Sequence, residues 1–240
     1  MTAIDKYYPY LMEVRKRLFF TLSVFAVAMF VGFFYYEKII KFIIDLLSLQ
    51  GINIVFTSPF QFINLAVSCG VVVGAVLTFP LIIGQILSFL KPALKPKEYK
   101  MVLGLLPFSI LLFLVGFGLG AFIMKWQIQI FLGRSIFLGI GNILDISKLL
   151  SVVLLTSAMM GIGFQFPIVL LILMRMKIIK HHHLARQRPW IYLGSFIFAL
   201  LLPLDSILAD VILTLPLVFL FEITLILDKL LDGREVINNV

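Results

Sequence analysis

The chain has 240 residues, of which 62% are hydrophobic and only 13% are charged. Soluble domains are less apolar and more charged, so this composition argues against a soluble globular protein and excludes an intrinsically disordered one. Several apolar stretches reach about 20 residues, the length at which a helix crosses a hydrocarbon core of roughly 30 Å. The composition therefore predicts an all-α, polytopic membrane protein.

The apolar stretches predict six transmembrane helices within one domain that covers residues 1–240. The predicted spans lie near residues 18–36, 62–90, 102–124, 150–174, 190–202 and 210–227. The last two are short, because residues 190–227 must supply both helices and the turn between them. Four spans contain or begin with a proline, at Pro80, Pro107, Pro167 and Pro216. Because proline bends a helix, we expect a curved bundle with a concave face.

The basic residues indicate how the spans are oriented. Most Lys and Arg residues lie in the N-terminal tail, in the segments after spans two and four, and in the C-terminal tail. The other side of the membrane receives Lys38, Lys41, Lys125, Arg134 and Lys148. The positive-inside rule therefore predicts that both termini are cytoplasmic, in a bacterial plasma membrane or in an organelle membrane. On the outer side, the apolar stretch 39–49 predicts an interfacial helix or a cap over the bundle.

No sequence motif indicates catalysis or a bound cofactor. The chain lacks a phosphate-binding glycine loop, an HExxH pair and a nucleophile elbow. We interpret His181, His182 and His183 as a solvated basic loop, and Cys69 has no second cysteine to pair with. We therefore expect a protein without enzymatic activity, cofactor or metal site. Its net charge of +8 follows from membrane topology, so nucleic acid is not an expected partner.

Acidic residues are uncommon on the basic cytoplasmic side, and Glu13 and Glu98 stand out there as candidate functional residues because of their negative charge. As local ion pairs, Glu13 would contact Lys16 or Arg17 at helical spacing and Glu98 would contact neighbouring lysines, each for a few tenths of a kcal/mol. In the middle of span four, Gln165 places an amide at membrane depth. Such a group either makes a helix-to-helix hydrogen bond or belongs to a functional polar patch.

Two blocks of sequence follow spacings that are characteristic of one protein family. Residues 11–18 read Leu-Met-Glu-Val-Arg-Lys-Arg-Leu, and a second block carries Pro80, Gln85, Phe89, Pro92 and Glu98. Further matching segments are 58–60, 163–167, 188–189 and 221–223, with Pro203 and Asp205 between the last two spans. These motifs resemble those of the TatC family, the six-span receptor subunit of the twin-arginine protein translocase. The resemblance covers nearly the whole chain.

The chain also departs from the family pattern. Tyr10, Gln165 and Ala209 stand where the family usually has histidine, glutamate and glutamine, and the turn 202–205 differs from the usual Thr-Pro-Pro-Asp. We therefore interpret the chain as a divergent member. These departures concern the membrane cavity and the partner site more than the signal-peptide site.

The resemblance implies a receptor that binds twin-arginine signal peptides of folded cargo in the lipid bilayer. It also implies homo- and hetero-oligomers with small single-span Tat subunits of the TatA or TatB type. The implied signal-peptide residues are Glu13, Glu98, Arg15, Arg17, Gln85 and Phe89. The implied partner-docking residues are Pro203, Asp205 and Glu222, and Gln165 is the implied intramembrane polar residue. Carboxylates on a basic surface suit this task, because guanidinium groups prefer bidentate contact with carboxylates.

The sequence also allows other functions. A small-solute or ion transporter would also explain the spans, the internal prolines and the polar residues Gln165 and Glu222, although no repeat relates the two halves of the chain. A membrane-embedded enzyme is a third reading, without a catalytic constellation to support it. Two residues also have structural alternatives to a functional role. Asp205 could cap the start of the sixth span, and Phe89 could pack against lipid or against the third span.

Overall fold

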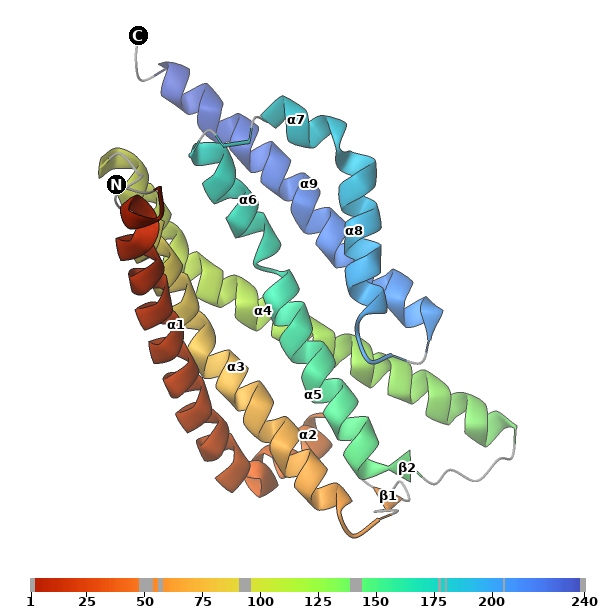
Figure 1. Cartoon of the computed structure of the whole chain (residues 1–240). Helices are drawn as coiled ribbons and strands as arrows, with labels where there is room; N and C mark the ends of the chain where they lie inside the picture. The colour runs from red at the N-terminus through yellow and green to blue at the C-terminus, as the bar shows by residue number, and fades with distance from the viewer. Residues whose placement is uncertain are drawn as a thin grey trace. The chain divides into compact units, whose positions relative to one another are not determined.

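The computed structural model describes residues 3–47, 54–55, 58–90, 96–138, 144–176, 178–179, 181–204 and 206–237 (Figure 1). These residues form helices and a short two-stranded sheet, as the apolar composition predicts. The chain divides into two compact units. The first contains Met1–Lys91 and Asp145–Ser151, and the second contains Pro92–Leu144 and Val152–Val240.

The first unit is built around two long helices that lie side by side, α1 and α3 (Figure 1). Its elements are α1 (Ala3–Phe34), α2 (Tyr36–Leu47), β1 (Ile54–Val55) and α3 (Gln61–Leu90), and β1 pairs with β2 (Leu144–Asp145). Glycines allow α1 and α3 to approach closely. A Cβ atom added at Gly70 would lie 2.7 Å from the carbonyl oxygen of Met29. Small residues serve the same purpose in other membrane helix pairs, where dispersion contacts replace the hydrophobic effect.

Helix α2 confirms the helix expected in the apolar stretch after the first span. Its residues Ile43 and Leu47 are buried, whereas Lys38 and Lys41 on the other side are exposed. A helix with one apolar and one charged face is typical of the interface between lipid and water.

Polar contacts join the start of α3 to the start of α5 (Ile146–Gly163). Asp145 caps α5, because its Oδ1 atom accepts a hydrogen bond of 3.1 Å from the backbone N–H of Lys148. Its Oδ2 atom accepts a hydrogen bond of 2.6 Å from the side-chain amide of Gln61, and the hydroxyl of Ser147 donates to the Gln61 carbonyl at 2.9 Å. The cap and these bonds fix where the fourth apolar segment begins.

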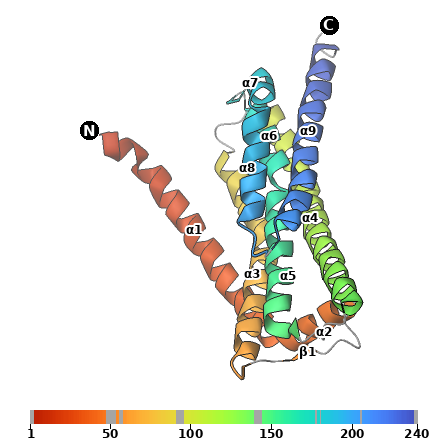
Figure 2. The same cartoon turned by 90° about the vertical axis from the view of Figure 1, so that its right-hand side faces the viewer.

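The second unit contains the remaining helices. They are α4 (Pro96–Phe137), the greater part of α5, α6 (Phe166–Arg175), α7 (His181–Arg186), α8 (Arg188–Leu200) and α9 (Ile207–Ile237). Helices α5 and α6 are separated at Phe164 and Gln165, just before Pro167. Pro167 has no N–H to donate to the carbonyl one turn earlier, and the fourth predicted span is interrupted just before it. Helices α8 and α9 lie side by side in both views (Figures 1 and 2).

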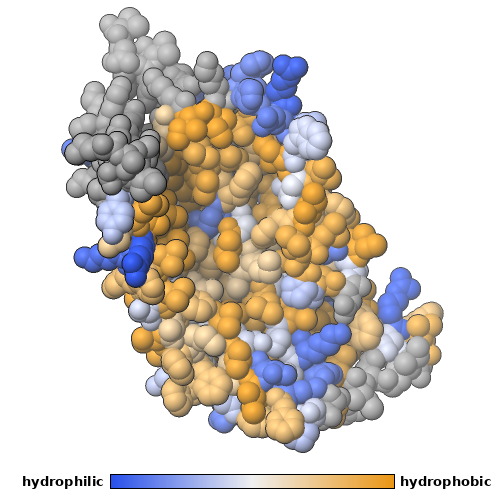
Figure 3. Space-filling view, in the orientation of Figure 1, coloured by the Kyte–Doolittle hydropathy of each residue, from blue (hydrophilic) through white to orange (hydrophobic). Residues whose placement is uncertain are grey.

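Among the described residues, five helical segments are long and apolar enough to cross a membrane: Leu11–Phe34, Gln61–Ile86, Leu103–Ser135, Ile146–Met174 and Ile207–Lys229. Most of the side-chain surface seen in Figure 3 is hydrophobic, as a lipid-facing surface requires. The fifth predicted span corresponds to α8, which has 13 residues and a length of about 20 Å.

Three helices extend well beyond their predicted spans. Helix α1 has 32 residues, helix α4 has 42 and helix α9 has 31. All three continue through Lys, Arg and Glu residues beyond the apolar stretch. These residues favour a helix but not the hydrocarbon core, so hydropathy locates the core and not the helix ends.

The glycines of α4 give a test of this packing. A Cβ atom at Gly116 would lie 2.6 Å from the ring of Phe164 and 2.8 Å from the carbonyl oxygen of Met160, whereas one at Gly118 would meet nothing within 4 Å. We predict that Gly116→Ala lowers the free energy of unfolding by about 1–3 kcal/mol, because the helices must separate. Thermal unfolding in detergent measures this. Gly118→Ala is the matched control, and equal melting temperatures for the two variants would contradict the prediction.

Candidate functional site

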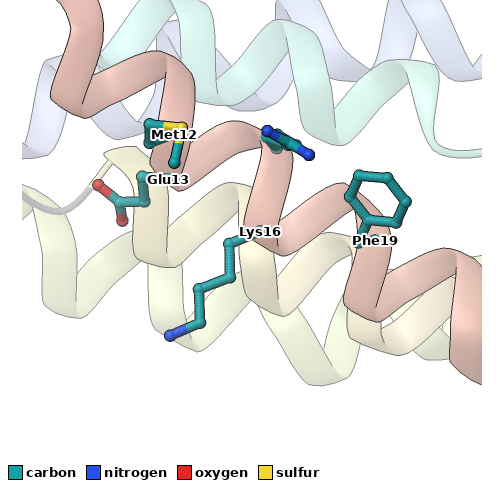
Figure 4. Close-up of a pocket in the computed structure, with 5 residues that line it drawn as sticks. Met12, Glu13, Lys16 and Phe19 are labelled. Carbon is teal, nitrogen blue, oxygen red and sulfur yellow. The ribbon is translucent and has the colours of Figure 1, made fainter.

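A shallow pocket of about 490 Å³ lies on the surface of α1 and is lined by Met12, Glu13, Arg15, Lys16 and Phe19. The lining residues are three or four positions apart along the helix, so they share one side of it. Figure 4 shows that Glu13 and Lys16 extend to the same side of the helix. The pocket therefore combines one carboxylate with basic groups and an aromatic ring.

The Glu13 carboxylate forms an ion pair with Arg17, one turn further along α1. Its Oε1 atom accepts two hydrogen bonds from the guanidinium, from Nη2 at 2.6 Å and from Nε at 3.1 Å. This is one of the two local partners that the sequence allows for Glu13. The Glu13 side chain is 48% exposed and the Arg17 side chain 28%. Because solvent screens such a pair, it contributes roughly 0.2–1 kcal/mol to stability.

Arg17 also connects α1 to α3. Its Nη1 atom donates a hydrogen bond of 3.1 Å to the main-chain carbonyl of Gln85, and the Thr21 hydroxyl donates to the Gln85 side-chain oxygen at 2.8 Å. The structure therefore brings together Glu13, Arg17 and Gln85, three residues of the predicted signal-peptide site. Thr21 was missed, although its position one turn after Arg17 on the same helix face was the available signal.

The other predicted signal-peptide residues are placed differently. The guanidinium carbon of Arg15 lies 5.6 Å from the centre of the Phe19 ring, in a cation–π contact within the pocket. Phe89 is exposed on α3, one turn after Gln85. Glu98 lies in the first turn of α4, in the second unit, and its side chain is outside the described residues.

Gln165 is buried at the break between α5 and α6. Its Oε1 atom accepts a 2.6 Å hydrogen bond from the Ser109 hydroxyl. Its Nε2 atom donates to the carbonyls of Ser109 at 3.2 Å and Gly161 at 3.4 Å. Because the Gln165 backbone N–H bonds to Ile162 instead, the side chain supplies the donor that a regular helix would give to Gly161. This geometry is the helix-to-helix hydrogen bond that the sequence allowed, with Ser109 as a partner that sequence reasoning missed.

Among the predicted partner-docking residues, Glu222 is engaged within the α8–α9 hairpin. Its Oε1 atom accepts a 2.5 Å hydrogen bond from the Tyr192 hydroxyl, and its Oε2 atom accepts a 3.0 Å bond from Arg188. Pro203 is exposed in the turn, and Asp205 lies outside the described residues. Asp210, which sequence reasoning did not single out, is buried in the first turn of α9.

The histidines do not gather into a metal site in the described part of the chain. His182 and His183 are exposed in α7, and no group of three or more His, Cys, Asp or Glu side chains was found among the described residues. His181 has no described side chain.

The contacts of Gln165 predict the effects of two substitutions. Gln165→Leu should leave the Ser109 hydroxyl and the Gly161 carbonyl without this partner and lower the free energy of unfolding by about 1–3 kcal/mol. Gln165→Glu, in its neutral form, keeps the acceptor for Ser109 and one donor, so it should be better tolerated. Thermal unfolding in detergent measures both effects. Wild-type stability in Gln165→Leu would show that the amide is dispensable for the fold.

Comparison with known proteins places this architecture in one family. The family model described as Sec-independent protein translocase protein (TatC) matches residues 9–216. TatCy of Bacillus subtilis strain 168 is 31% identical over 224 residues, which cover 90% of this chain and 86% of that protein. TatC of Escherichia coli K12 is 26% identical over 229 residues, which cover 94% of this chain and 88% of that protein.

A solved structure gives the same result for the fold. The crystal structure of the twin-arginine translocase receptor TatC in DDM aligns with a TM-score of 0.80 and 26% identity, covering 91% of this chain and 98% of that one. The resemblance seen in the sequence motifs is therefore confirmed over most of the chain. The chain belongs to the TatC family of Sec-independent protein translocase proteins, which are multi-pass membrane proteins.

Proposed function

We propose that this chain is the membrane receptor and core subunit of a twin-arginine translocase. In this role it binds the twin-arginine signal peptides of folded proteins and recruits single-span partners for export. The observation that carries the proposal is the family match across residues 9–216, which includes the basic turn of α1 with Glu13. The small-solute transporter considered from the sequence is not favoured, because the similar proteins are translocase components.

The geometry of α1 supports recognition of guanidinium groups. Glu13 is half-exposed on a pocket that also contains Arg15 and Lys16. A carboxylate there attracts an incoming arginine through a charge-assisted hydrogen bond, while the surrounding cations disfavour positive groups that do not reach it. We propose Glu98 as the second acid on the strength of its signature position, with Arg15, Gln85 and Phe89 in the walls of the site and Arg17 bonded to Glu13 behind them.

The paired acids give the first test of this function. Loss of a charge-assisted hydrogen bond costs about 1.5–3 kcal/mol, so Glu13→Gln/Glu98→Gln should bind a twin-arginine peptide at least tenfold more weakly. Fluorescence anisotropy with the detergent-solubilised protein measures the affinity. Glu37→Gln, which removes an exposed acid from α2, is the matched control and should bind normally. Equal affinities for all three proteins would contradict the assignment.

The α8–α9 hairpin is the proposed docking surface for a single-span partner. Helix α8, at about 20 Å, is shorter than the hydrocarbon core, and a partner helix would relieve the resulting mismatch. Apolar side chains remain exposed along both helices, among them Ile197, Leu201, Leu215 and Phe219. Pro203 lies between the two helices, and Asp205 follows it two positions later in the sequence. Glu222 would act by holding the hairpin together, because both of its carboxylate oxygens are already bonded.

Site-specific crosslinking tests this surface. A photoreactive residue at Leu201 (69% exposed) or Phe219 (66% exposed) should capture the single-span partner. The same residue at Phe122 in α4, which is also 69% exposed, is the matched control and should not capture it. Capture through position 122 alone would place the docking surface on α4 instead.

A further inference from the structure

We propose that Arg17 is a positioning residue, which orients the Glu13 carboxylate so that one of its oxygens can receive an arginine of the signal peptide. This inference rests on the proposed function and adds a role for a group that does not itself contact the cargo. The two carboxylate oxygens of Glu13 do not accept the same number of hydrogen bonds. Both hydrogen bonds from Arg17 go to Oε1 of Glu13, at 2.6 and 3.1 Å.

The second oxygen, Oε2, is the one left for a ligand. Within the described part of the chain it receives no hydrogen bond, and the Glu13 side chain is 48% exposed beside the pocket. A carboxylate has acceptor sites on both oxygens, so it can bind a second guanidinium while it keeps the first. Arg17 and an incoming arginine therefore share the carboxylate, each with its own oxygen.

Arg17 is itself held in place, which makes it a support and not a competitor. Its third hydrogen bond, 3.1 Å from Nη1 to the Gln85 carbonyl, anchors the guanidinium to α3. The Arg17 side chain is only 28% exposed. Displacing it would break three hydrogen bonds on two helices, whereas binding at Oε2 breaks none of them. The planar guanidinium thus bonds to both the α3 backbone and the Glu13 carboxylate, so the position of α3 determines how the carboxylate is oriented.

Lysine cannot replace Arg17 in this role. A guanidinium presents five N–H groups in a fixed plane, and Arg17 uses three of them toward two acceptors. An ammonium keeps the positive charge but is a point charge on a flexible stem, so the carboxylate would be neutralised without being oriented. Directional contact matters here because Arg15 and Lys16 flank the same turn and repel any cation that gains only a diffuse attraction.

The test compares Arg17→Lys with the parent chain in peptide binding. The ligands are a twin-arginine peptide and the same peptide with a Lys-Lys pair, and the readout is the ratio of the two affinities. We expect Arg17→Lys to lose about tenfold in affinity for the arginine peptide and to change little for the lysine peptide, so that the ratio falls. A purely electrostatic role of Arg17 would leave the ratio unchanged, since the charge is kept.

The matched control is Ser68→Ala, which removes the 3.1 Å hydrogen bond from the Ser151 hydroxyl to Ser68 of α3 but leaves the Glu13–Arg17 pair intact. It should keep the parent ratio. Melting temperatures are recorded for each variant, and Arg17→Gln, which retains a planar amide donor, replaces Arg17→Lys if the latter does not fold. A rise in peptide affinity in either Arg17 variant would identify Arg17 as a competitor and overturn the proposal.

Failure of the inference differs from failure of the proposed function. If the parent chain itself did not prefer the arginine peptide, the receptor function would be wrong. If the parent preferred it and Arg17→Lys kept the full preference with an unchanged melting temperature, only the positioning role would be wrong.

Discussion

A polar group in a hydrocarbon environment must find its hydrogen-bond partner within the protein, and this constraint governs how the apolar helices are interrupted. Pro167 removes a backbone donor in the middle of the fourth apolar segment, and the helix breaks there. At this break the Gln165 side-chain amide donates to the Gly161 carbonyl, which the Gln165 backbone N–H would bond in a regular helix, and it also binds Ser109 on α4. A local defect in one helix thus becomes a specific contact between helices. Hydroxyl groups follow the same rule, since Ser157 and Thr224 each donate to the carbonyl one turn earlier.

Two ion pairs differ in how the hydrogen bonds are distributed over the carboxylate oxygens. In the α8–α9 hairpin, both oxygens of Glu222 are occupied, by Tyr192 and by Arg188. On α1, both hydrogen bonds from Arg17 converge on a single oxygen of Glu13. In Glu222 each oxygen accepts one hydrogen bond and serves the packing of two helices, whereas in Glu13 one oxygen accepts both bonds and the other accepts none from the described residues. Identical chemical groups therefore have different availability, which depends on how their partners divide the oxygens.

The sequence was a good guide to elements and a partial guide to contacts. Apolar stretches of about 20 residues located the long helices, and the spacing of Glu13 and Arg17 correctly allowed their ion pair. Contacts between helices were not accessible in this way, because a link such as Arg17 to the Gln85 carbonyl involves a backbone group that every residue carries. Ser109 was missed for a similar reason, since a serine in an apolar helix normally bonds to its own backbone. The arrangement of Glu98 relative to Glu13 stays a prediction.

The basic turn of α1 has a consequence for how this protein can evolve. Orientation of a first membrane helix depends on nearby lysines and arginines, and acidic residues contribute little to it. Arg15, Lys16 and Arg17 would therefore direct insertion of α1 with or without the carboxylate that lies among them. Under the proposed function, substitution of Glu13 would alter the choice of ligand while the insertion of α1 stayed intact. The same helical turn would thus determine both the orientation of α1 and the proposed preference for cargo, through different residues. Cargo preference could therefore change in a chain that still inserts correctly.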